Sequence, residues 1–132
     1  MRAVLDASAA IEIALDGKAA ATLLDALADA EEVIAPELLI AELVNAIWKY
    51  HRFGQLDLAK CDLALALAVG LVDRLVSHAE IYREAFALSR AQQSRAAYDM
   101  FYLALARRED AALLTLDGGL KKQALRQGIR IA

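Results

Sequence analysis

The chain has 132 residues, of which 59% are hydrophobic, and its formal net charge is −3. A chain of this length can bury a core of its own, and the composition excludes an intrinsically disordered protein. The acidic balance argues against binding of nucleic acid through a global positive field, although a local rim of Lys and Arg is compatible with it. We expect a single domain over residues 1–132.

The cellular setting is predicted from what the chain lacks. Cys61 is the only cysteine, so no internal disulfide can form, which suits a reducing cytosol. The longest strongly apolar stretch without charge, Leu63–Val72, is too short to span a bilayer. Asp6 interrupts the first apolar run before the hydrophobic segment of a signal peptide develops. We therefore expect a cytoplasmic protein that does not associate with membranes.

Short apolar runs alternate with helical patterns along the chain. Strands are predicted at 2–5, 33–35, 111–116 and 129–131, while 71–76 is compatible with a strand or a loop. Helices are predicted to follow residue 6 and to cover about 18–30, 36–54, 56–70, 78–92, 95–109 and 120–127. Ser8 is expected to cap the first helix and Pro36 to begin the third, and Gly118 with Gly119 is expected to form a turn. This alternation predicts an α/β fold with a short, mostly parallel sheet covered on both faces.

Four acidic residues lie in otherwise apolar stretches and have no basic neighbour in the sequence: Asp6, Glu42, Asp99 and Asp117. A carboxylate in such a place is unfavourable unless it has a partner. If the fold brings the four together, each pair at roughly 6 Å repels by about 3 kcal/mol at an effective dielectric of about 20. A hard divalent cation with oxygen ligands would offset this repulsion. The pattern predicts metal-dependent phosphodiester chemistry, provided that the four acids converge.

The position of each acid gives a reason for convergence. Asp6 and Asp117 directly follow predicted strands, and the carboxyl ends of parallel strands meet at the edge where ligands bind. The alternative is that each is an ordinary turn or helix-capping residue. Glu42 and Asp99 are each the only charge in eleven residues of helical pattern, whereas a surface helix carries several. For Asp99 the alternative is a first-turn acid favoured by the helix dipole, if the helix begins at Tyr98.

Four segments carry a family resemblance, and they follow one another as Val4–Ala9, Pro36 with Glu42–Asn45, Tyr98–Ala106 and Leu114–Asp117. In this order and spacing they resemble the PIN domain, and specifically the VapC type of bacterial toxin. The resemblance covers essentially the full length. It implies a three-layer α/β/α fold, an endoribonuclease that depends on Mg²⁺ or Mn²⁺, a cognate antitoxin as partner and a homodimer.

The resemblance also assigns residues. The four acids become the catalytic and metal-binding group, with Asp6 and Asp99 as the most direct ligands. Three polar residues are implied to orient carboxylates or waters: Ser8, Asn45 and Thr115. Six basic residues downstream of the acids are candidates for contact with RNA phosphates: Lys49, Arg52, Arg107, Arg108, Lys121 and Lys122. For Arg107 and Arg108 the alternative is that they complement the negative end of a helix dipole.

For two tyrosines the sequence leaves two roles open, and for the two histidines it predicts none in the site. Tyr98 and Tyr102 are candidates for stacking on a base or for core packing. Neither His51 nor His78 has the spacing of a metal site, and both are expected at the surface.

Other classes of protein fit the sequence less well or differ only in activity. A haloacid-dehalogenase-like phosphatase expects a second Asp two residues after Asp6, where this chain has Ser8. A receiver domain needs an acidic pair at the end of its first strand. An interaction module that binds an antitoxin-like protein or RNA without cutting stays open. Loss of RNA integrity that needs both metal and Asp99 separates the enzyme from such a module.

Overall fold

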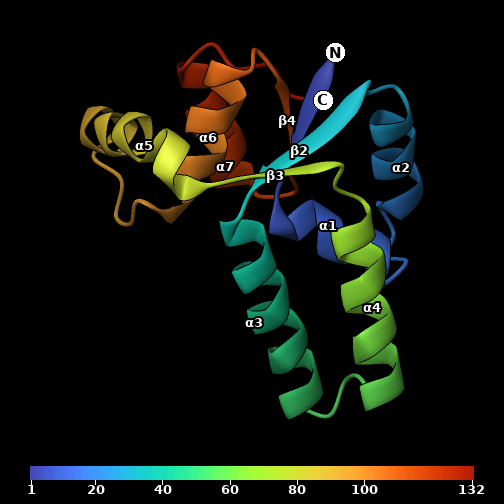
Figure 1. Ribbon diagram of the computed structural model, residues 1–132. Helices are drawn as coiled ribbons and strands as arrows, with labels where there is room; N and C mark the ends of the chain where they lie inside the picture. Colours follow the sequence, from blue (N-terminus) through green and yellow to red (C-terminus); the bar gives the residue numbers. More distant parts are fainter.

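The computed structural model describes all residues 1–132, and a sheet of four parallel strands runs through its centre in the order β3-β2-β1-β4 (Figure 1). The strands are β1 (Arg2–Leu5), β2 (Glu32–Pro36), β3 (Arg74–Val76) and β4 (Ala112–Leu114). Their apolar runs are almost continuous, which is what burial on both faces requires. The prediction of a parallel sheet is confirmed, and the undecided segment 71–76 contains a strand.

Seven helices cover the sheet and complete three layers, as predicted. One core contains side chains of α1 (Ala7–Ala14), α2 (Ala20–Ala28), α3 (Leu38–Arg52) and α4 (Leu58–Gly70). The other core contains side chains of α5 (His78–Gln92), α6 (Tyr98–Arg108) and α7 (Gly118–Arg126). Successive strand residues point to opposite faces, so Val4 enters the second core and Leu5 the first.

Helices α3 and α4 form an antiparallel hairpin that extends away from the sheet (Figure 1). Three residues at helical spacing, Leu39, Leu43 and Ile47, form the buried stripe of α3. Tyr50, the next position of the predicted stripe, is exposed. None of the seven helices combines the length and the hydropathy that crossing a membrane requires.

Two predicted helix starts are wrong. Pro36 is the last residue of β2, where it pairs with Val76, and α3 begins two residues later at Leu38. Proline suits a strand end because it has no N–H to donate to the ladder. Asp6 rather than Ser8 caps α1, since Asp6 Oδ1 accepts the backbone N–H of Ala9. Asp and Ser are both favourable N-cap residues, so the residue type alone does not identify which of the two caps the helix.

Three further boundaries differ near the carboxyl terminus. Gly118 and Gly119 form the first turn of α7 rather than a separate turn, with Asp117 as its cap. The expected last strand is reduced to one bridge between Ile131 and Leu113. Helix α6 begins at Tyr98, so the alternative in which Asp99 lies in the first turn of its helix is confirmed.

An ion-pair network joins the amino ends of three strands. Arg74 Nε lies 2.6 Å from Glu32 Oε1, and Arg74 Nη2 lies 2.9 Å from Glu109 Oε1. Arg2 closes the network, with Nε 3.3 Å from Glu32 and Nη1 3.7 Å from Glu109. The hydrogen bond from Arg74 holds the pKa of the Glu32 carboxyl below its usual value. The network therefore ties β1, β2, β3 and the end of α6 together at the amino edge of the sheet.

Candidate active site

The four predicted acids come together at the opposite, carboxyl edge of the sheet. Asp6 follows β1, Asp117 caps α7 shortly after β4, Asp99 lies in the first turn of α6, and Glu42 lies in the second turn of α3. They repel one another in pairs: Asp6 acts on Asp99 and Glu42, Asp117 on Asp6 and Asp99, and Asp99 on Glu42. The four acids therefore converge, which is the condition for the metal-dependent chemistry that the sequence pattern predicts.

Asp6 is the most buried of the four, with 6% of its surface exposed. Its Oδ1 accepts hydrogen bonds from Ser8 Oγ at 2.7 Å and from the backbone N–H of Ala9 at 3.1 Å. Its Oδ2 accepts one from Thr115 Oγ1 at 2.5 Å. These three donors compensate for the lost solvent and fix the orientation of the carboxylate, while Oδ2 keeps a lone pair free.

The two hydroxyl groups beside Asp6 also fix the segment that carries Asp117. Ser8 Oγ accepts the backbone N–H of Leu116 at 2.9 Å, and Thr115 Oγ1 accepts that of Asp117 at 3.0 Å. Ser8 and Thr115 thus both contact the carboxylate of Asp6. Asn45 is exposed and forms no hydrogen bond with any of the four acids.

Glu42 has a partner that the sequence did not predict. Tyr102, which is 1% exposed, donates its hydroxyl to Glu42 Oε1 at 2.5 Å across 60 positions of sequence. Burial and this bond raise the pKa of Tyr102, so the phenol stays protonated and acts as a donor. Of the two readings for this residue, core packing holds, while Tyr98 is exposed. The bond fixes α3 against α6 at the level of the acids.

Tyr102→Phe is expected to lower the free energy of unfolding at pH 7 by about 1–2 kcal/mol, because a hydrogen bond to a charged group is lost while the ring stays packed. Urea denaturation followed by circular dichroism measures the change. Tyr82→Phe is the matched control, since Tyr82 is exposed and its hydroxyl contacts only Arg83. Equal losses in the two variants would contradict a specific role for the bond with Glu42.

Burial raises the pKa of Asp6, Glu42 and Asp99 above that of a free carboxyl. Repulsion among the acids raises these values further, whereas Thr115 and Ser8 oppose the rise at Asp6, and Tyr102 opposes it at Glu42. Asp99 accepts no hydrogen bond that would oppose the rise of its pKa, and Asp117 and Asp6 both repel its charge. The site therefore holds excess negative charge that nearby protein groups only partly compensate.

The donor set suits a hard divalent cation. All the ligand atoms on offer are carboxylate oxygens, and each acid keeps at least one oxygen with a free lone pair. No group of three His, Cys, Asp or Glu side chains is arranged to hold an ion directly. This arrangement fits ligation that is partly through water, which is the mode that Mg²⁺ favours.

The six basic candidates divide by position. Lys49 lines a groove of about 490 Å³ between α1 and α3, together with Ser8, Glu42 and Asn45. Lys121 and Lys122 lie in the first turns of α7, directly after Asp117. Each of these three lysines thus shares a groove or a helix start with one of the acids.

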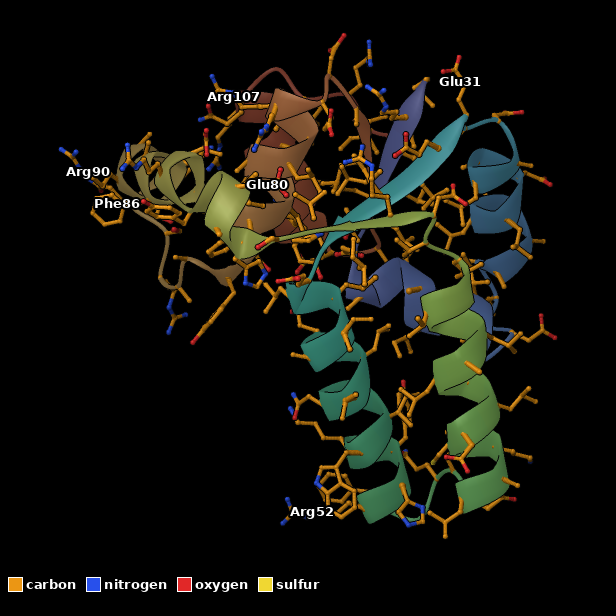
Figure 2. The ribbon with its side chains drawn as sticks, in the orientation of Figure 1. Glu31, Arg52, Glu80, Phe86, Arg90 and Arg107 are labelled. Carbon is orange, nitrogen blue, oxygen red and sulfur yellow. The ribbon has the colours of Figure 1, made fainter.

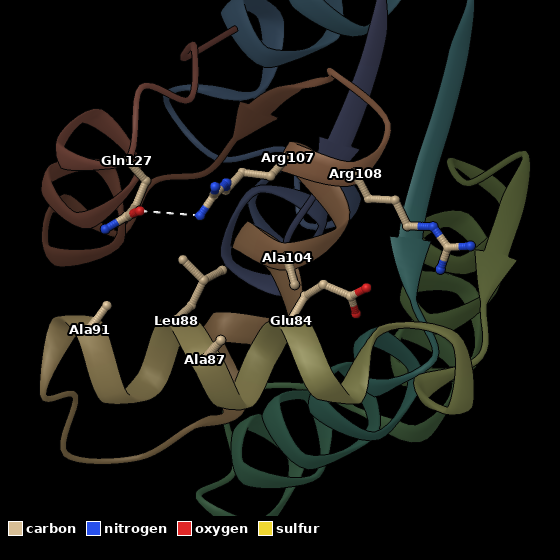
Figure 3. Close-up of a pocket in the computed structure, with 8 residues that line it drawn as sticks. All are labelled: Glu84, Ala87, Leu88, Ala91, Ala104, Arg107, Arg108 and Gln127. Atoms are coloured by element: carbon tan, nitrogen blue, oxygen red, sulfur yellow. Dashed lines mark hydrogen bonds between the residues drawn. The ribbon is translucent and has the colours of Figure 1, made fainter.

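The three arginines lie elsewhere, so the six basic candidates do not form one rim around the acids. Arg107 and Arg108 occupy the last turn of α6, about 12–14 Å along the helix from Asp99. They line a separate pocket of about 550 Å³, where Arg107 donates a hydrogen bond to Gln127 (Figure 3). Arg108 donates a hydrogen bond to the backbone oxygen of Glu80. Arg52 lies at the tip of the α3–α4 hairpin, far from Arg107 (Figure 2). The helix-dipole reading matches the position of Arg107 and Arg108.

Both histidines are half-buried rather than at the surface, because each ring bonds the backbone. His51 Nδ1 lies 2.8 Å from Leu56 O, and His78 Nε2 accepts the N–H of Leu38 at 2.9 Å. The contact of His78 spans 40 positions, and no local pattern in the sequence indicates it.

Comparison with known proteins agrees with this geometry. A family model described as PIN domain matches residues 3–125. The curated protein ribonuclease VapC3 of Pyrobaculum aerophilum is 31% identical over 125 residues, which cover 93% of this chain and 95% of that protein.

Solved structures share the fold. PAE2754 of Pyrobaculum aerophilum superimposes with a TM-score of 0.70 at 23% identity, over 99% of this chain and 83% of the other. VapBC2 of Rickettsia felis, solved bound to a DNA fragment from its promoter, gives a TM-score of 0.70 at 14% identity, over 100% and 98% of the two chains. The similarity to solved structures establishes the fold. The family model and the curated relative together establish the family. This chain belongs to the PIN domain family and is of the VapC type.

Proposed function

We propose that this protein is an endoribonuclease that hydrolyses RNA phosphodiester bonds with Mg²⁺ or Mn²⁺, and that it is the cytoplasmic toxin of a toxin–antitoxin pair. The observation that carries the proposal is the convergence of four carboxylates from four segments, three of them with raised pKa values. The name of the relative, ribonuclease VapC3, supports RNA as the substrate.

The proposed mechanism assigns separate roles to the residues of the site. A divalent cation held there supplies a water of lowered pKa and neutralises charge on the phosphate. Asp6 and Asp99 are the proposed direct ligands, and Glu42 and Asp117 bind directly or through water. One carboxylate of raised pKa accepts the proton of the attacking water. Ser8 and Thr115 are proposed to keep Asp6 in the orientation that ligation needs, because both donate to its carboxylate.

Three lysines are proposed to hold the RNA backbone. Lys49 lines the same groove as Glu42, and Lys121 and Lys122 follow Asp117 at the start of α7. Ammonium groups close to an acidic centre attract the phosphates that flank the scissile bond. The groove beside Glu42 supports this path for the strand.

An antitoxin partner and a homodimer are proposed from the apolar surface that the fold leaves uncovered. Large side chains of the α3–α4 hairpin are exposed, among them Trp48, Phe53, Leu58 and Leu63. A groove of about 430 Å³ between the end of α1 and the hairpin is lined by Leu15, Tyr50 and Leu63. Exposed apolar surface of this kind marks sites of protein association, and a groove of this shape suits a helical or extended segment.

The test is incubation of total RNA with purified, metal-stripped protein, with and without Mg²⁺, Mn²⁺ or a chelator. We expect discrete fragments only with a cation. Attack by water leaves linear phosphates, so fragments are expected without 2′,3′-cyclic phosphate ends. Intact RNA under every cation, with folded and partner-free protein, would support the non-cutting interaction module instead. Cleavage that the chelator does not stop would contradict metal dependence.

A further inference from the structure

His78, the first residue of α5, contacts the first residue of the helix that carries Glu42. Its Nε2 accepts the backbone N–H of Leu38 at 2.9 Å. A nitrogen that accepts a hydrogen bond carries no proton, so this contact requires the tautomer with its proton on Nδ1. Leu38 begins α3 and lies one turn before Glu42 on the same face.

Helix α3 has no cap of its own. Glu37 occupies the N-cap position with helical backbone angles, and its side chain makes no capping hydrogen bond. The first N–H groups of a helix need partners from elsewhere in such a case. Here the segment between β3 and α5 provides them, because Val76 O accepts the N–H of Glu37 at 3.0 Å and His78 accepts that of Leu38. The start of α3 is therefore fixed by a segment 40 positions away.

The same ring contacts the helix that carries Asp99. The rings of His78 and Phe101 pack with centroids 4.7 Å apart and planes inclined by 48°. Phe101 lies two residues after Asp99 and next to Tyr102, whose hydroxyl bonds Glu42. One imidazole thus touches both α3 and α6, close to the acids that those helices carry.

We propose that His78 is a positioning residue for the acidic site. Through Leu38 and Phe101 it sets the placement of Glu42 relative to Asp99 before a cation binds. The inference rests on the proposed function in that the site is taken to bind a divalent cation. The role depends on an acceptor at the position of Nε2. If His78 only filled space in the core, the volume of its ring would matter and the lone pair of Nε2 would not.

The experiment measures Mn²⁺ affinity of the metal-stripped chain by titration calorimetry and exchange of the Leu38 amide by NMR. His78→Leu is expected to bind Mn²⁺ about 10-fold more weakly, which is the size of effect typical of groups that orient metal ligands, and to exchange this amide faster. His78→Gln places an amide oxygen near the position of Nε2 and is expected to restore both values. Asp99→Asn reports the background of Mn²⁺ binding elsewhere.

His51→Leu is the matched control. His51 lies on the same helix, and its ring bonds a backbone oxygen at 2.8 Å, but it is at the opposite end from the acids. This variant is expected to keep the Mn²⁺ affinity of the wild type, whatever stability it loses.

Wild-type affinity in His78→Leu would overturn the inference, and so would a His78→Gln variant as weak as His78→Leu. Equal weakening by His51→Leu would do the same. Mn²⁺ binding without RNA cleavage would refute the proposed function. The Mn²⁺ affinities of the His78 variants would still test the role of His78. Cleavage with unchanged affinity in His78→Leu would refute the role of His78 alone.

Discussion

Asp99→Asn is expected to abolish RNA cleavage and at the same time to stabilise the metal-free protein. Cleavage should fall by at least about 100-fold, because a direct ligand contributes more than groups that only orient ligands, whose loss costs about 10–100-fold. Burial and repulsion by Asp117 and Asp6 disfavour the charged form of Asp99. The neutral amide removes that cost, so we expect a higher melting temperature for the metal-free variant than for the metal-free wild type.

The gain in stability should depend on pH with a defined sign. The pKa of Asp99 is higher in the folded chain than in the unfolded chain, so the wild type loses stability as the pH rises through the folded value. Below the unfolded pKa of about 3.9 the carboxyl is protonated in both states and no cost remains. The advantage of Asp99→Asn is therefore largest at neutral pH and vanishes near pH 4.

Asp62→Asn is the control for this substitution, since Asp62 is exposed on α4 and forms no ion pair. It is expected to keep both cleavage and melting temperature. Thermal melts of metal-stripped protein and RNA assays on the same preparations measure both effects. An Asp99→Asn variant that cleaves RNA as the wild type does would remove Asp99 from the proposed ligands. A less stable variant would contradict the repulsion.

Thr115→Val is expected to cause the largest loss of stability among these single substitutions, about 3 kcal/mol at pH 7. Thr115 is 2% exposed, and its hydroxyl both donates to Asp6 and accepts the N–H of Asp117. Valine keeps the volume but leaves a buried carboxylate with one donor fewer and a backbone N–H without its partner. Because Thr115 is the main group that lowers the pKa of Asp6, that pKa should rise further.

Urea denaturation of Thr115→Val, Thr115→Ser and Thr22→Val measures this effect. Serine keeps the hydroxyl and should lose about 1 kcal/mol or less, since only a methyl group is removed. Thr22 is the only other threonine and is exposed on α2, so its valine variant should keep the stability of the wild type. A Thr115→Val variant as stable as the wild type, or one that loses no more than Thr115→Ser, would contradict the role given to the hydroxyl of Thr115.

The sequence was sufficient for the sheet and for the convergence of the acids because both follow from simple rules. Asp6 and Asp117 come just after apolar strands, and parallel strands bring their carboxyl ends to one edge. Glu42 and Asp99 stood out because a lone charge in an apolar helix needs a structural reason. Both arguments use only local patterns, which one sequence contains.

The partners of these acids could not be predicted in the same way. A tyrosine in a buried helix has the same local pattern whether its hydroxyl bonds water or, as at Tyr102, a carboxylate 60 positions away. The contact of His78 with Leu38 is equally long-range. Arg107 and Arg108 are candidates for RNA contact only because they follow Asp99 in the sequence. The rise of the helix separates them from Asp99 by about 12–14 Å.

The ion-pair network of Arg2, Glu32, Arg74 and Glu109 lies at the end of the strands opposite to the acids. At about 3.3 Å per residue, the four residues of β1 separate the two edges by more than 10 Å. Energetic effects of substitutions at sites more than about 7–10 Å apart usually add. The ion pairs at one edge and the acids at the other can therefore vary independently in this fold, so a lineage can exchange the residues of one edge while the other is kept.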